Sequence, residues 1–292
     1  MTDSAQSPQP LSPVDLQPAT PRRAIPWAKY GLIGGVLLYL SLLIFIPAVN
    51  VFVQAFSGGI EGILETFAKR PFQNAVGLTI LTAAIAVPLN AVFGLAAAWA
   101  IARHRFPGRT FVLSLIDLPF SVSPVVAGLM LVLLYGNNGW FGPFLNALGI
   151  RVVFALPAMI LATAFVSMPF VAREVIPVLE EVGFDQEEAA ETLGARGWQV
   201  FWRVTIPSIR WGLLYGLLLT NARAMGEFGA VSVVSGNIVG KTQTLPLYVE
   251  HAYKQYETQS AYTAAAILAC LAFVTLVLKE ILERKTRIKD AE

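Results

Sequence analysis

Two charged side chains lie inside an otherwise apolar stretch of this sequence. Arg223 and Glu227 are four residues apart, so on a helix they share one face and can neutralise each other. Arginine also presents paired donors that suit an oxyanion, and Asn221 adds a neutral amide nearby. Because ionisable residues at membrane depth usually face a bundle interior or a water-filled path, these three residues are candidates for an anion pathway. A purely structural ion pair is an equal alternative.

Other groups that could do chemistry are sparse. His104 and His251 stand alone, which predicts no metal site, and the single cysteine, Cys270, excludes an intrachain disulfide. No nucleophile lies near a base, so we expect neither an enzyme nor a bound cofactor, and a net charge of +2 is too small to indicate nucleic-acid binding. The segment GNIVGKT at 236–242 has three residues between its glycines where a phosphate-binding loop has four. This segment is therefore not expected to bind a nucleotide.

The one long polar segment, residues 185–207, reads as two short helices separated by glycines. Asp185 is predicted to cap the first helix, with Glu188 reaching back to the cap. Gly194 should end that helix after residues 186–193, because glycine adopts the left-handed conformation cheaply. The second helix is predicted at 198–204, with an apolar face at three- and four-residue spacing, and Pro207 should end or kink it.

This segment resembles the EAA loop of permease subunits of bacterial ABC importers, whose pattern is E-A-A-x3-G-x9-I-x-L-P. Val204 and Ile206 stand where the pattern has isoleucine and leucine. The resemblance implies a cytoplasmic coupling helix that docks in a cleft of a separate ATPase. The coupling residues would be Glu187, Glu188, Ala189, Ala190, Gly194, Val204, Ile206 and Pro207. An ordinary amphipathic helix pair at the surface is the alternative.

Composition places most of the chain in a membrane. Hydrophobic residues make up 55% of the 292 residues and charged residues only 14%, with apolar runs of about 20 residues. Intervals without charge locate six predicted spans, because an unpaired charge at the bilayer centre costs about 2.5 kcal/mol or more. The predicted spans are residues 30–56, 75–102, 111–135, 154–176, 209–228 and 261–282.

The distribution of Lys and Arg predicts the orientation of these spans. Fifteen such residues, Arg173 among them, are assigned to the side that holds both termini and the 185–207 segment, and five to the other side. The excess of positive charge marks the cytoplasmic side, so both termini and the segment are predicted to be cytoplasmic.

Four segments are predicted along the chain. Residues 1–24 are rich in Pro, Ser, Gln and Thr and should form a disordered cytoplasmic tail. Residues 25–70 would hold the first span and its external connection, and residues 71–282 a transmembrane domain with its coupling loop at 178–210. Residues 283–292 would be a second cytoplasmic tail.

A wider resemblance covers roughly residues 70–280. The stretches FPGR at 106–109, LPFSVSPVVAGL at 118–129 and NARAMGEFGA at 221–230 resemble the permeases for sulfate, thiosulfate and molybdate. Ser123 departs from a second proline that many relatives carry, which favours the CysW-type subunits of sulfate/thiosulfate importers. The resemblance implies an all-α, six-helix permease of the type I (MetI-like) importer fold in a bacterial inner membrane.

The same resemblance implies partners and a mechanism. A CysT-type second permease, a CysA-type ATPase dimer and a periplasmic sulfate/thiosulfate-binding protein would complete the importer. ATP binding would move the docked helix, and rigid spans would pass that motion to the anion cavity, which opens alternately to each side. A molybdate or tungstate permease is one alternative. A secondary anion carrier or channel that needs no ATPase is the other, although no inverted repeat is detected.

Overall fold

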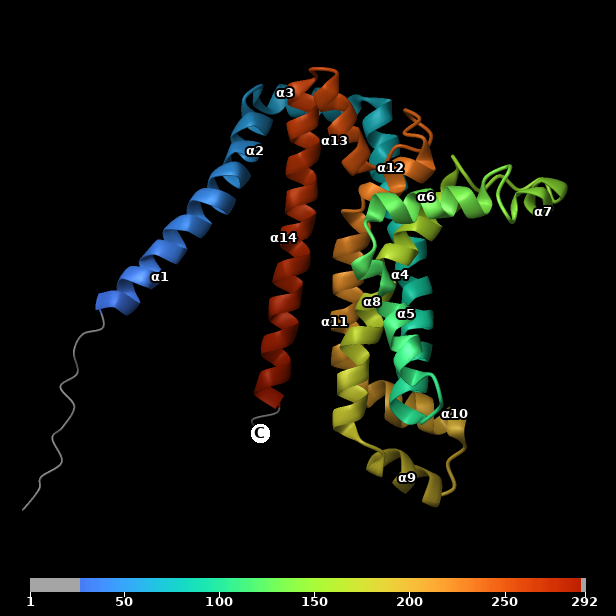
Figure 1. The fold of residues 1–292 in the computed structure, drawn as a ribbon. Coiled ribbons are helices and arrows are strands. Elements are labelled where there is room, and N and C mark those ends of the chain that lie inside the picture. The colour runs from blue at the N-terminus through green and yellow to red at the C-terminus, as the bar shows by residue number, and fades with distance from the viewer. Residues whose placement is uncertain (1–26, 290–292) are drawn as a thin grey trace, which may run out of the picture. The chain divides into compact units, whose positions relative to one another are not determined.

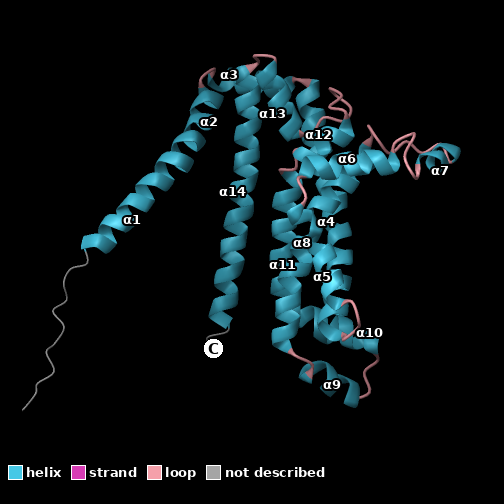
Figure 2. Ribbon diagram, viewed as in Figure 1, coloured by secondary structure: helices cyan, strands magenta, loops and turns pink. Residues whose placement is uncertain are grey.

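The structure is a computed structural model that describes residues 27–289 (Figures 1 and 2). All regular elements among these residues are helical. The chain divides into two units, one that ends at Pro47 and one that begins at Ala48. The first unit contains α1 (Trp27–Leu40), a π-helical turn η1 (Ser41–Phe45) and the first residues of α2 (Ile46–Phe56). The tail predicted at 1–24 lies outside the described residues, as do residues 290–292.

The second unit continues with long helices joined by short ones. The helices up to the 185–207 segment are α3 (Gly59–Ala68), α4 (Arg70–Arg103), α5 (Arg109–Ser121), α6 (Pro124–Tyr135), α7 (Gly142–Ala147) and α8 (Leu156–Val182). The later elements are α9 (Asp185–Thr192), α10 (Gly197–Val200), a second π-helical turn η2 (Phe201–Thr205), α11 (Ile206–Met225), α12 (Gly229–Ser235), α13 (Leu245–Lys254) and α14 (Thr258–Lys289).

Four helices in the described part of the chain are long and apolar enough to cross a membrane: Lys29–Phe56, Arg70–Arg103, Leu156–Val182 and Thr258–Leu278. The pair α5 and α6 adds a fifth if it counts as one broken span. The 20-residue helix α11, which carries Arg210 and Arg223, is not among them. The number of six spans and their orientation therefore stay predictions.

The span predicted at residues 111–135 is broken in the structure. The chain breaks after Ser121, and α5 and α6 form an angle of 110°. Pro124 explains the break, since the ring forces the preceding Ser123 into extended backbone with ψ 134°. Packing then holds α6 in place: a Cβ at Gly128 would lie 2.6 Å from the carbonyl oxygen of Ala230 in α12. Helix α6 therefore leaves the direction of α5 altogether (Figure 1).

Helices α4, α8 and α11 form the centre of the second unit. Their shared core contains five buried side chains: Ala98, Val171, Val175, Leu179 and Ile209. Gly216 lets α11 approach α8 closely, because a Cβ there would lie 3.0 Å from the Cα of Val171. All three helices reach the end of the bundle where α9 and α10 lie (Figure 1). The 185–207 segment is thus mounted on the helices that share this core.

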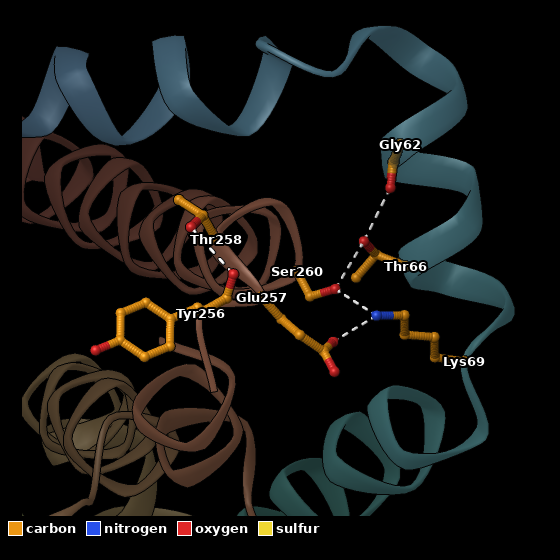
Figure 3. Close-up of polar contacts among 7 residues, drawn as sticks. All are labelled: Gly62, Thr66, Lys69, Tyr256, Glu257, Thr258 and Ser260. Atoms are coloured by element: carbon orange, nitrogen blue, oxygen red, sulfur yellow. Dashed lines mark hydrogen bonds and ion pairs between the residues drawn. The ribbon is translucent and has the colours of Figure 1, made fainter. Parts of the chain in front are cut away.

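A polar junction closes the opposite end of the second unit (Figure 3). The ammonium group of Lys69, between α3 and α4, donates to the carboxylate of Glu257 and, over 2.9 Å, to the hydroxyl of Ser260. The hydroxyls of Thr66 and Ser260 lie 3.5 Å apart, and Gln259 donates to the carbonyl oxygen of Ala55 over 2.7 Å. The first turn of α14 is therefore tied to the α2–α3–α4 corner.

The Lys69 hydrogen bond lowers the pKa of the Glu257 carboxyl from its ordinary value of 4.5, against a smaller opposing effect of burial. A lowered folded-state pKa stabilises the fold above the unfolded value, and this stabilisation is lost as the pH falls through the folded value. Both side chains are about half exposed, so the contribution should stay below about 1 kcal/mol.

We therefore expect Glu257→Gln to lower the melting temperature slightly at neutral pH, and the difference from the native protein to vanish at about pH 3. Thermal unfolding of detergent-solubilised protein across this range measures it. Glu65→Gln, which removes a carboxylate from α3 near the same junction, is the matched control and should leave the melting temperature nearly unchanged. A difference that persists unchanged in acid would contradict the assignment.

Candidate functional site: the α9–α10 loop

Helix α9 confirms the first helix predicted in the polar segment, with a different start. It begins at Asp185 itself, after Phe184, and no side chain caps it, so the prediction that Asp185 is the cap is wrong. Instead Asp185, Glu187 and Glu188 place negative charge in the first turn, where the helix dipole favours it. Gly194 adopts φ +88°, and its amide bonds to the carbonyl of Glu191, as predicted for a glycine that ends the helix.

The second helix of the segment does not end at Pro207. Helix α10 passes through η2 into α11 without interruption. In η2 the amide of Ile206 bonds to the carbonyl of Phe201, five residues back, which is a π turn. Proline has no N–H and its ring clashes with the carbonyl four residues back, so a widened turn before Pro207 lets the helix continue. The same order, a π turn and then Ile-Pro, occurs at η1 and Pro47.

A buried arginine from α4 holds this loop to the bundle. The side chain of Arg103 is only 4% exposed and that of its partner Glu187 in α9 is 15% exposed. Arg103 donates from Nη2 to Oε1 of Glu187 over 3.1 Å and from Nη1 to the carbonyl oxygen of Leu179 in α8 over 2.8 Å. Its Nε makes an ion-pair contact of 3.0 Å with Oε2 of Glu187.

Two further contacts complete this arrangement, which we call the Arg103 clamp (Arg103, Leu179, Phe184, Glu187 and Thr205). The hydroxyl of Thr205, in η2, donates to Oε1 of Glu187 over 2.7 Å. The guanidinium of Arg103 lies 4.7 Å from the ring centroid of Phe184, within cation–π range. The clamp thus joins α4, α8, α9 and η2 at one point, although no pattern in the sequence singles out Arg103.

The remaining coupling candidates divide by exposure. Glu188, Ala189, Gly194 and Pro207 are exposed, whereas Ala190 and Val204 are half-buried and Ile206 packs against the α4–α8–α11 core. Glu187 is turned inward to the clamp, so its neighbour Glu188 is the acid that a partner can reach. The side chains of Leu193 and Trp198 are 89% and 71% exposed, and Trp198 packs edge-on against Trp202. The loop therefore presents large apolar side chains outward from a rigid mount.

The anion-pathway candidates lie at the other end of α11. Nη1 of Arg223 is 2.6 Å from Oε2 of Glu227, which confirms the predicted ion pair. Glu227 is only 3% exposed, and its Oε1 accepts the amide of Ala230 over 2.8 Å, in the first turn of α12. Asn221 is half-buried beside the sulfur of Met225. Glu227 thus fastens α12 to α11, while Arg223 stays about one-third exposed.

These features together indicate a helical membrane protein with an exposed polar loop, α9–α10, at one end of its bundle. Residues 90–288 match the family model described as "Binding-protein-dependent transport system inner membrane component". The chain is 66% identical over 255 residues to the sulfate transport system permease protein CysW of Synechococcus elongatus, which covers 87% of this chain and 89% of that protein. It is 37% identical to the permease protein CysT of Escherichia coli K12, over 87% and 92% of the two chains.

The chain therefore belongs to the family of binding-protein-dependent transport system inner membrane components, and within it to the CysW permeases. A solved bacterial alginate ABC transporter, in complex with an alginate pentasaccharide-bound periplasmic protein, has a chain of the same fold. The TM-score is 0.71 at 18% identity, over 89% of this chain and 94% of that one. The protein is accordingly an inner-membrane permease subunit of an ABC importer and not an enzyme. Membership of this family excludes the alternative of a secondary carrier or channel that needs no ATPase.

Proposed function

We propose that this subunit moves sulfate or thiosulfate across a bacterial inner membrane by alternating access, driven by a separate ATPase that docks on the α9–α10 loop. The CysW relatives are named as sulfate transport permeases, which supports sulfate as the substrate. Glu187, Glu188, Ala189, Ala190, Gly194, Val204, Ile206 and Pro207 are the coupling residues that we propose. Asn221, Arg223 and Glu227 belong to the anion pathway in this proposal.

The observation that carries the coupling role is the combination of a rigid mount with an exposed apolar surface. Tryptophan is among the residues that contribute most to protein interfaces, and both Trp198 and Leu193 are largely exposed. The Arg103 clamp ties the same loop to α4 and α8, so a displacement of the loop must move those helices. A helix pair that only covered the surface would turn these apolar side chains inward.

The partners follow from the same assignment. The CysT relative supports a second permease of that type beside this one. Two CysA-type ATPase subunits would occupy the cytoplasmic side, and a periplasmic sulfate/thiosulfate-binding protein would deliver the anion on the other side. The proposal includes six spans with both termini in the cytoplasm, which places the docking loop where an ATPase reaches it.

Reconstituted transporter tests the proposal directly. The permease, its predicted partner subunits and the binding protein are assembled in proteoliposomes, and uptake of labelled sulfate is measured with unlabelled thiosulfate or molybdate as competitors. We expect ATP-dependent uptake that excess thiosulfate reduces and equimolar molybdate leaves nearly unchanged. Stronger competition by molybdate would make the chain a molybdate or tungstate permease. Uptake without ATP would contradict the coupling role.

A further inference from the structure

A second arginine, Arg173, lies inside a helix that is long and apolar enough to cross a membrane, although the positive-charge tally counts it on the cytoplasmic side. Arg173 lies in α8, nine residues before the helix ends at Val182, and Asp117 lies in α5, eight residues after the helix begins at Arg109. At 1.5 Å per residue both are about 12–14 Å from the helix ends that face the loop. The hydrocarbon core of a bilayer is about 30 Å thick, so both side chains are at membrane depth.

These two residues form an ion pair that is open to the surroundings of the subunit. Nε of Arg173 donates to Oδ1 of Asp117 over 2.7 Å. The side chains are nevertheless 56% and 37% exposed. An exposed ion pair against lipid tails is costly, so charged residues at this depth face protein or a water-filled passage. The face shared by α5 and α8 here therefore meets a partner subunit or a water-filled passage in the assembled transporter.

The surroundings of Arg173 suit a mobile anion. The guanidinium lies 5.3 Å from the ring centroid of Phe120, and Phe120 meets Phe170 edge-on at 5.3 Å. This apolar wall fixes the plane of the guanidinium on one side. Arginine has five N–H donors, and the bond to Asp117 uses only one of them. The two terminal nitrogens retain donors in the fork geometry that matches oxyanions.

The Arg173–Asp117 pair and the Arg223–Glu227 pair make different contacts with neighbouring helices. Glu227 is buried and fastens α12 through its bond to Ala230. Asp117 is only half-buried, and its side chain contacts Arg173 without capping a helix. Helices α5 and α8 already have another ion pair, Arg109 with Glu180, closer to the loop. The structural need for an Arg173–Asp117 tie is therefore small.

We propose that Arg173 is a binding station for a tetrahedral oxyanion in the passage, with Asp117 as the counter-ion that holds the guanidinium between transport events. This assignment rests on the proposed function as an oxyanion importer. An arriving dianion takes the terminal nitrogens of Arg173, and Asp117 competes for the same positive charge. The competition keeps the anion from binding too tightly to leave, which a transport site requires.

Four variants in the complete reconstituted transporter test the role. Arg173→Gln should lower sulfate uptake by about tenfold or more, while stimulation of the ATPase by the loaded binding protein stays within about twofold of the native value. Arg173→Lys keeps the positive charge but loses the paired donors of the guanidinium. Its uptake should lie between those of Arg173→Gln and the native protein, with a KM above the native value. Asp117→Asn should lower both KM and the turnover rate, because the anion is held longer. Arg109→Gln removes the neighbouring ion pair and is the matched control, with uptake unchanged.

The double variant Arg173→Gln with Asp117→Asn separates a binding role from a structural one. It contains no unpaired charge, so a purely structural pair predicts that it assembles and transports normally. The binding role predicts normal assembly with uptake as low as in Arg173→Gln alone, and normal uptake overturns it. If the native transporter takes up no sulfate at all, the proposed function fails. If the native protein transports and Arg173→Gln does so equally well, only the assignment of Arg173 fails.

Discussion

Arg103→Ala is expected to abolish coupled transport. The substitution removes the guanidinium that Glu187, the carbonyl of Leu179 and the ring of Phe184 share, and leaves the Glu187 carboxylate buried without its countercharge. Breaking a buried ion pair in this way costs about 3–5 kcal/mol. Helix α9 should then detach from α4 and α8, and both uptake and stimulation of the ATPase by the binding protein should fall by more than about tenfold.

Two further variants make this result specific. Arg105→Ala removes an exposed arginine two residues along the chain and should leave both activities intact. Arg103→Ala combined with Glu187→Gln removes the unpaired buried charge as well, so it should recover expression and assembly without recovering coupling. Normal uptake by the Arg103→Ala transporter would show that the clamp transmits nothing.

Gly194→Val is the second substitution with a large expected effect. Gly194 has φ +88°, and a Cβ built there meets nothing within 4 Å, so the whole cost is conformational. Forcing a β-branched residue into this region costs about 1–3 kcal/mol. The connection between α9 and α10 should therefore shift, with normal insertion but a joint loss of uptake and stimulated ATPase activity in reconstituted transporter.

Gly197 supplies a control that is matched in residue type and surroundings. It lies three residues further on, its φ is not positive, and a Cβ there also meets nothing within 4 Å. Gly197→Val should therefore transport almost normally. Gly194→Asn should fall between the native protein and Gly194→Val, because asparagine tolerates the left-handed region better than valine does. Equal activity of the two valine variants would show that the positive φ does not matter for coupling.

Local patterns in the sequence predicted what depends on near neighbours. The spacing in residues 185–207 indicated two helices with a break at Gly194, and α9 and α10 confirm it. The four-residue spacing of Arg223 and Glu227 likewise indicated their ion pair. Both predictions rest on rules that operate within one or two helical turns.

The sequence could not predict features that depend on packing between distant segments. The close contact between Gly128 and Ala230 holds α6 at 110° to α5. No local pattern in the sequence specifies that contact. Arg103 and Glu187 are separated by 84 residues, so the sequence offered no reason to connect them. The tally of positive charges counts Arg173 on the cytoplasmic side. Such a tally does not show that helix α8 continues to Val182 beyond this residue.

The π turn before Pro207 has a mechanical consequence. It allows residues 197–225 to form one uninterrupted helical rod, about 40 Å long at 1.5 Å per residue. One end of this rod carries the exposed indole of Trp198, and the other carries Arg223 with the anchor of α12 beside it. In the proposed coupling, a displacement of Trp198 would therefore be transmitted to the Arg223 end through continuous helix. The widened turn lies between the two ends, so in the proposed coupling its stiffness would influence how much of the movement reaches Arg223.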